Sequence, residues 1–245
     1  MTPVLFIHGW GQSSRAWFGQ TDSLSEDFDV RCIDLPGHGG EAEAEAADWP
    51  EMLMRRIPDE PAIVVGWSLG GMLAMHLALL HPERFRALAL VAATPRFTCA
   101  DDWPNGCPDD LFADFESGVA EASNKALSRF FALMLHGDGL SRSRYQEIAR
   151  QAVNRRTPPS FSALEAGLHW LAGLDLRADL QRLHIPCLVM YGDSDSVVPA
   201  AAGHELAVRL PQAREIVFSM CGHAPFLTQA DAFNRQLEAW CRTVI

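Results

Sequence analysis

Continuous apolar runs recur along most of the chain, and a longer stretch of mixed apolar and polar residues follows each of them. Apolar runs without strict alternation indicate strands buried on both faces, as in a parallel sheet covered by helices. They predict strands at residues 4–7, 28–34, 62–65, 85–92, 186–192 and 213–218. The stretches between them predict helices at residues 14–24, 49–57, 72–80, 200–210 and 231–244. This order favours an α/β fold with a mostly parallel sheet and right-handed crossovers.

The alternation breaks between residues 98 and 179, where no convincing strand pattern occurs. This segment predicts helices at residues 108–117, 121–135, 141–154 and 160–171. We therefore expect a core formed by residues 1–97 and 180–245, and an all-helical lid formed by residues 98–179. An insertion between two strands at the carboxyl edge of the sheet would cover a site there.

Composition and charge narrow the class of protein. With 48% apolar residues over 245 positions the chain can bury a sizeable core. No apolar run reaches the roughly 18 residues of a membrane span, and the net charge of −11 argues against nucleic-acid binding. The N-terminus has no basic segment or small-residue cleavage site, so we expect a cytoplasmic protein. The six cysteines lack metal-binding spacing and predict reduced thiols, so we expect no metal ion and no other cofactor.

The stretch Gly66-Trp67-Ser68-Leu69-Gly70-Gly71 lies between a predicted strand and a predicted helix, and it has the Gly-x-Ser-x-Gly pattern of a nucleophile elbow. A sharp strand-to-helix turn strains the backbone at the serine and brings neighbouring backbones close. Side chains at Gly66 and Gly70 would then clash. A glycine-rich turn with an ordinary serine is the alternative, and the other residues of the site decide between the two.

A serine hydroxyl needs a base to become a nucleophile, and His223 is the best candidate. It follows the last predicted strand, in a loop with glycine before it, and could reach back over the sheet edge. His8 fits a structural role, and His76 and His81 lie on the elbow helix away from the serine. His136 and His169 belong to the predicted lid and remain open.

The base needs an acid that orients it, and the loop after residues 186–192 offers two carboxylates. We prefer Asp195 because the Gly-x-x-Asp-x-x-x-Pro spacing places it deeper in the loop, and Asp193 is the alternative. Two backbone N–H groups should stabilise the oxyanion that forms on attack: that of Leu69 at the helix N-terminus and that of Trp10 in the first loop. The chain order Ser, Asp, His is that of α/β-hydrolases.

Together these motifs carry a resemblance that spans nearly the whole chain. The sequence resembles the α/β-hydrolase superfamily and, within it, the family of pimeloyl-[acyl-carrier protein] methyl ester esterases of biotin synthesis. The matching stretches are His8-Gly9-Trp10-Gly11, Asp34-Leu35-Pro36-Gly37, Gly66 to Gly71, His81-Pro82-Glu83-Arg84, Asp102-Trp103-Pro104, Arg129-Phe130-Phe131-Ala132-Leu133 and His223-Ala224-Pro225-Phe226. One departure is that the chain begins at the strand before His8, so we expect the usual N-terminal β-hairpin to be missing and the sheet to be about two strands short.

The resemblance implies a serine carboxylesterase that releases methanol from a pimeloyl methyl ester carried on acyl carrier protein, with Ser68, His223 and Asp195 as the catalytic residues. It also implies an acyl-binding site formed by Trp10, Ser68, Leu69, His223 and the lid segment Phe130, Phe131, Ala132, Leu133 and Met134. The alternative for that segment is that it is simply the core-facing side of the lid.

The lid has a charge unlike that of the whole chain. Between residues 125 and 156 lie seven basic residues and only two acidic ones. The family places carrier-binding arginines in this region, and the candidates here are Lys125, Arg129, Arg142 and Arg144. A basic face on an acidic enzyme suits docking of an acidic carrier protein; solvated helix charges are the alternative.

Beyond the carrier we expect no nucleic-acid or membrane partner, and we expect a monomer. Two other functions stay open: a broader carboxylesterase or C–C bond hydrolase with the same triad, and a ligand-binding protein without useful turnover. Ser68 argues against the dehalogenase branch, which needs an aspartate at that position.

Overall fold

The computed structural model describes residues 1–121 and 124–245 of the chain. Its centre is a six-stranded sheet in the order β2-β1-β3-β4-β5-β6, and every strand pair within the described residues is parallel. The strands are β1 (Pro3–Ile7), β2 (Asp29–Ile33), β3 (Ala62–Trp67), β4 (Phe85–Val91), β5 (Cys187–Gly192) and β6 (Ala213–Phe218). The predicted α/β fold with a parallel sheet is therefore confirmed.

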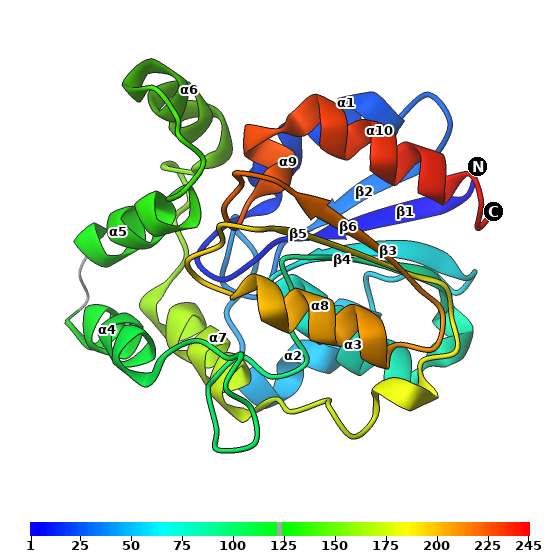
Figure 1. Ribbon diagram of the computed structural model, residues 1–245, viewed down its shortest axis with the longest axis horizontal. Helices are drawn as coiled ribbons and strands as arrows, with labels where there is room; N and C mark the ends of the chain where they lie inside the picture. The colour runs from blue at the N-terminus through cyan, green and yellow to red at the C-terminus, as the bar shows by residue number, and fades with distance from the viewer. Residues whose placement is uncertain (122–123) are drawn as a thin grey trace.

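Helices cover both faces of this sheet (Figure 1). On one face lie α1 (Phe18–Leu24) and α10 (Ala230–Cys241), and on the other lie α2 (Trp49–Met54), α3 (Leu69–Leu80) and α8 (Ala200–Arg209). Strands β1, β3 and β5 are buried at every position, which explains their continuous apolar sequences. The edge strands β2 and β6 expose part of their side chains.

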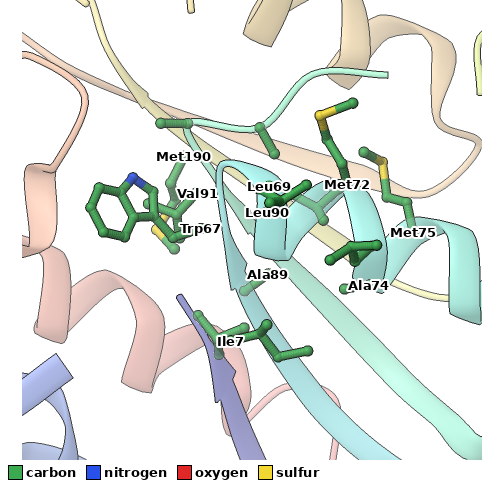
Figure 2. Close-up of a cluster of buried hydrophobic side chains, with 14 of the residues drawn as sticks. Ile7, Trp67, Leu69, Met72, Ala74, Met75, Ala89, Leu90, Val91 and Met190 are labelled. Atoms are coloured by element: carbon green, nitrogen blue, oxygen red, sulfur yellow. The ribbon is translucent and has the colours of Figure 1, made fainter. Parts of the chain in front are cut away.

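Both neighbours of Ser68, Trp67 and Leu69, belong to a cluster of buried apolar side chains. Figure 2 shows side chains from the strands, including Ile7, Trp67, Val91 and Met190, packed near those from the first turns of α3. The α3 side chains in this cluster include Leu69, Met72 and Met75, all buried. The elbow is therefore held by close packing, which resists displacement.

Four more helices lie together beyond the carboxyl ends of the strands, at the left of Figure 1. They are α4 (Asp109–Ala120), α5 (Asn124–Met134), α6 (Arg142–Ala152) and α7 (Phe161–Gly173). Two contacts join the chain entering and leaving this group: an isolated antiparallel bridge between Arg96 and Asp175, and an ion pair of 2.9 Å between the same side chains.

Several helix boundaries differ from the prediction. Helix α3 starts directly after Ser68, and α4 runs three residues past 117 to Ala120 because Val119 extends its buried stripe. Helix α10 ends at Cys241 rather than at 244, and the short helix α9 (Pro225–Thr228) was not predicted. The predicted helix at 121–135 corresponds to α5 from Asn124 onward; its residues 122–123 lie outside the described residues.

The strand order locates a site before any side chain is considered. Strand β2 lies on one side of β1, and the chain then crosses to β3 on the other side of β1. Ligands of open parallel sheets bind at such a switch point, outside the carboxyl ends of the strands. In this sheet that position lies between the ends of β1 and β3, where Ser68 follows β3. Within the described residues, no helix combines the length and apolar character needed to cross a membrane.

Candidate active site

Ser68 occupies the turn between β3 and α3 with a strained backbone, at φ 53° and ψ −119°. A non-glycine residue at positive φ is costly and persists only where the surrounding packing fixes it. The glycines on either side allow that packing. A Cβ atom at Gly66 would lie 2.6 Å from the Gly70 carbonyl oxygen, and one at Gly70 would lie 2.5 Å from the carbonyl oxygen of Ile7. The close approaches expected of an elbow are therefore present.

The loop after β1 lies directly against the serine. A Cβ atom at Gly9 would come within 3.2 Å of the Ser68 Cβ atom. The next residue, Trp10, is buried, and its indole N–H donates to the Leu164 carbonyl at 2.9 Å. Neither the Trp10 N–H nor the Leu69 N–H donates one of the backbone hydrogen bonds made by turns and loops in the described chain. Neither group is therefore committed to a turn or loop carbonyl there.

His223 and Asp195 form a fully buried pair. The His223 Nδ1 atom lies 2.7 Å from the Asp195 Oδ2 atom, and both side chains have 0% exposure. The other Asp195 oxygen accepts from the Val197 and Val198 N–H groups at 2.8 and 3.0 Å. A carboxylate held in this way keeps the proton on Nδ1, so Nε2 carries the free lone pair.

The His223 Nε2 atom is buried and has no hydrogen-bond partner in the described part of the chain. Buried polar atoms are normally satisfied, so an unpartnered ring nitrogen calls for an explanation. The Trp67 indole N–H donates to the His223 carbonyl oxygen at 2.9 Å, and the two rings lie 5.7 Å apart. The residue before Ser68 therefore holds the backbone of the histidine.

The other candidate groups lie elsewhere. Asp193 is exposed and accepts from the Met220 N–H at 2.7 Å, so it closes the loop rather than contacting His223. His136 lies 3.1 Å from the Ser196 hydroxyl through Nδ1, and His169 is exposed on α7. His8 is buried; its Nε2 accepts from the Leu35 N–H at 3.0 Å, while its Nδ1 lies 2.8 Å from the Gly9 carbonyl oxygen. Its role is to tie two loops together.

A pocket of about 330 Å³ lies between α4 and α5, above Trp10. Of the predicted acyl-site residues, Trp10 and, on α5, Phe130 and Leu133 line it, whereas Ser68, Leu69 and His223 do not. Phe115 of α4 lines it too, with its ring 5.8 Å from that of Trp10. Phe115 was missed, although its spacing of four residues from Leu111, another lining residue, was a readable signal of a shared helix face.

The remaining residues of the segment 130–134 are placed differently. Phe131 faces the other side of α5, in a second pocket of about 510 Å³ bordered by α6. Met134 is buried, and its carbonyl oxygen accepts from the His223 N–H at 2.8 Å. Ala132 is exposed and lines neither of these pockets. It lies on the side of α5 that faces solvent, whereas its neighbours Phe131 and Leu133 each face a pocket.

All four candidate docking residues are exposed. Lys125 and Arg129 lie one turn apart on α5, and Arg129 also lines the α4–α5 pocket. Arg142 and Arg144 lie in the first turn of α6. The Arg144 guanidinium pairs with Glu147 at 2.8 Å, whereas the ion pairs of the described residues include none for Lys125, Arg129 or Arg142.

Comparison with known proteins agrees with this geometry. The sequence model of the alpha/beta hydrolase fold family matches residues 2–230. The pimeloyl-[acyl-carrier protein] methyl ester esterase of Nitrosomonas europaea is 38% identical over 233 residues, which cover 94% of this chain and 92% of the relative. The protein of the same name from Vibrio cholerae serotype O1 is 38% identical over 236 residues, covering 96% and 92%.

Solved structures share the fold at lower identity. A bromoperoxidase from Bacillus anthracis superposes with a TM-score of 0.85 at 24% identity, over 98% of this chain and 92% of that one. An esterase from Exiguobacterium antarcticum superposes with a TM-score of 0.86 at 22% identity, over 99% and 92%. At these identities the structures show the fold alone, whereas the sequence relatives show the family. The chain therefore belongs to the α/β-hydrolase fold family and, within it, to the family of the pimeloyl-[acyl-carrier protein] methyl ester esterases.

Proposed function

We propose that this protein is a serine carboxylesterase that hydrolyses the methyl ester of pimeloyl-[acyl-carrier protein], giving methanol and pimeloyl-[acyl-carrier protein] for biotin synthesis. The names of its relatives supply the substrate. The observation that supports the chemistry is the buried His223–Asp195 pair of 2.7 Å, whose free Nε2 atom belongs to the same packed unit as the Ser68 elbow.

The proposed reaction has two halves. The Ser68 hydroxyl attacks the ester carbonyl while His223 Nε2 takes its proton, and Asp195 stabilises the imidazolium that forms. The imidazolium then gives its proton to the departing methoxide, so methanol leaves and an acyl-serine remains. Water attacks the acyl-serine with His223 as base again, which frees the carboxylate and restores the Ser68 hydroxyl.

The Leu69 and Trp10 backbone N–H groups are the proposed oxyanion donors. They are not used by other backbone groups in the turns and loops of the described chain, and Leu69 starts a helix whose dipole favours negative charge there. Losing such a donor typically costs about 100-fold or more in kcat. The packing of Gly9 against Ser68 keeps the Trp10 loop beside the serine.

We assign the acyl chain to the α4–α5 pocket, between Trp10, Phe115, Phe130 and Leu133. Its aromatic and aliphatic side chains suit a thin apolar chain, and Asp114, Glu121 and Arg129 line the same pocket. Residues 98–179 are then the lid over this site, and residues 1–97 and 180–245 are the core. Ala132 has no part in this assignment, because it faces solvent.

We assign the carrier protein to the exposed face formed by Lys125, Arg129 and Arg142, with Arg144 at its margin because Glu147 already neutralises it. Arg129 connects this face to the pocket, which is the route that a tethered acyl chain must take. Opposite charges of this kind raise the rate of association and orient the partners. We further propose a cytoplasmic monomer, and its six free cysteines suit a reducing compartment.

The test is turnover of the carrier-linked methyl ester by the purified protein, followed by mass spectrometry of the carrier. We expect demethylation that Ser68→Ala abolishes. The free methyl ester of the same acyl group is the comparison, because equal kcat/KM on both substrates would indicate a broader carboxylesterase. Complementation of a biotin auxotroph checks the biological assignment, and failure by a well-expressed protein would contradict it.

The docking face is tested separately by charge reversal. We expect Arg142→Glu to lower kcat/KM for the carrier-linked ester and to weaken its dependence on salt, with a much smaller effect on a small ester. Arg86→Glu is the matched control, since Arg86 is also exposed but lies on β4 outside the lid. Equal losses from both reversals would rule out this face.

A further inference from the structure

The turn between α5 and α6 contacts both loops that carry the acid and the base. We call residues 135–139 the brace turn, residues 193–196 the acid loop and residues 220–223 the base loop. The brace turn belongs to the helical group beyond the sheet, whereas the other two loops follow β5 and β6. The fold thus brings together three segments that are distant in sequence.

The contact with the base loop is made through the backbone. The His223 N–H donates to the carbonyl oxygen of Met134, at the end of α5, at 2.8 Å. A Cβ atom at Gly222 would lie 2.7 Å from that same oxygen, 2.9 Å from the His136 carbonyl oxygen and 2.7 Å from the Asp138 Oδ2 atom. The residue before the histidine must therefore be glycine for the brace turn to approach this closely.

The contact with the acid loop is equally close. Gly137 has φ +95°, and a Cβ atom there would lie 2.8 Å from the Ser194 carbonyl oxygen. His136 Nδ1 lies 3.1 Å from the hydroxyl of Ser196, the residue after Asp195. The brace turn thus packs against residues next to Asp195 and next to His223.

Asp138 is the unusual residue of this turn. Both carboxyl oxygens are buried, and neither accepts a hydrogen bond of normal geometry in the described part of the chain, although three donors lie close by. Burial raises the pKa of Asp138, and the charge of Asp195 adds to that rise. Three donors nearby act against it: the Thr228 hydroxyl, the Gly222 N–H and the Cys221 thiol. Burying a carboxyl whose hydrogen bonds are incomplete costs stability.

We propose that Asp138 is a positioning residue, whose side chain presses on the base loop at Gly222 and thereby holds the His223 imidazole in line between Asp195 and Ser68. This inference rests on the catalytic roles proposed above. Small displacements of a catalytic group are costly: a shift of about 1 Å can lower the rate about 100-fold. A side chain that fills the space behind Gly222 limits such a shift.

The same contacts would couple the base to the acyl pocket. Phe130 and Leu133 line that pocket, and Met134, the next residue, accepts from the His223 N–H. A ligand that orders the end of α5 would therefore also order the base loop.

The test compares Asp138→Ala with Asp138→Asn on a small soluble ester, p-nitrophenyl butyrate. We expect Asp138→Ala to lower kcat about tenfold with little change in KM, because the base is displaced while the pocket is intact. Asp138→Asn keeps the shape and should restore kcat to within about threefold of wild type. Asp109→Ala, which removes an exposed carboxyl from α4, is the matched control and should change neither constant.

Two further measurements separate positioning from folding. The proton between His223 Nδ1 and Asp195 gives a low-field NMR signal when it is held, and we expect this signal to broaden in Asp138→Ala while the melting temperature does not fall. His136→Ala should also lower kcat, whereas His169→Ala, the exposed histidine of α7, should not.

Wild-type kcat in Asp138→Ala would overturn the inference, and so would an Asp138→Asn variant as slow as Asp138→Ala. An unchanged low-field signal together with a lowered melting temperature would do the same, since that combination describes a structural role. If the wild type itself shows no ester hydrolysis that depends on Ser68, the proposed function fails instead, and the two failures are thereby distinguished.

Discussion

Two buried tryptophans offer a matched test of how the base is held. Trp67 and Trp17 are both 0% exposed and both pack on Phe226, at ring distances of 4.9 and 4.1 Å. The Trp67 indole N–H donates to the His223 carbonyl at 2.9 Å. The Trp17 indole N–H is buried without a partner in the described chain. Replacing either residue by phenylalanine removes the same atoms. At Trp67 the replacement removes a satisfied indole donor, and at Trp17 it removes an unsatisfied one.

The magnitude follows from that difference. Trp67→Phe leaves the buried His223 carbonyl without its indole donor, which costs about 1–3 kcal/mol of unfolding free energy beyond the lost packing. Trp17→Phe loses similar packing but removes an unsatisfied buried donor, which raises the unfolding free energy by a comparable amount. We expect Trp67→Phe to be less stable than Trp17→Phe by about 2 kcal/mol or more. For a chain of this size that difference corresponds to about 4–8 °C in melting temperature.

Thermal unfolding and small-ester kinetics measure both consequences. Trp67→Phe should also lower kcat, because the His223 backbone loses a fixed partner, whereas Trp17→Phe should leave kcat nearly unchanged. Equal melting temperatures for the two variants would refute the hydrogen-bond argument. A larger loss of kcat in Trp17→Phe would refute the idea that Trp67 holds the base.

Three other substitutions test separate parts of the structure. Asp195→Asn should lower kcat about 10⁴-fold through loss of the correct tautomer, and Asp193→Asn should have little effect; equal losses in steady-state kinetics would exchange their roles. Gly70→Ala places a Cβ atom 2.5 Å from backbone oxygens at the end of β1 and should abolish soluble expression, while Gly173→Ala, with open space around it, should not. Burial lowers the pKa of His38 from 6.5 to about 3, so the unfolded chain binds the extra proton and the unfolding free energy falls as pH drops through that window. His38→Asn should flatten this dependence in denaturant titrations at several pH values, and an unchanged slope would contradict it.

The local pattern of the sequence was enough to predict the sheet and its elbow. Strands buried on both faces need apolar residues at every position, so Val64 and Val189 leave the same signature wherever they lie in a parallel sheet. The elbow was equally readable, because only glycine tolerates the contacts at Gly66 and Gly70. Helix ends were less predictable: α4 continues past the predicted end at 117 to Ala120, where Val119 extends the buried stripe of Phe112 and Phe115.

Helix α5 shows how far a family resemblance predicts the roles of single residues. A contiguous segment from Phe130 to Met134 was expected at the acyl site, but a helix turns consecutive side chains about 100° apart. Phe130 and Leu133 therefore share one pocket, Phe131 faces another and Ala132 faces solvent. The sequence indicated a helix that does line a pocket, and which of its side chains face that pocket depends on packing against α4 and Trp10.

The sequence by itself determined which residue types are present in order after the strands: a serine between glycines, an aspartate and a histidine, each in its own loop. Only the tertiary structure decided how they meet. It chose Asp195 over Asp193 as the neighbour of His223, linked Trp67 to the histidine carbonyl, and brought Asp138 against Gly222. The physical reason is range. Strand burial and turn geometry are written in neighbouring residues, whereas hydrogen bonds across 28 or 156 positions depend on how the whole chain packs.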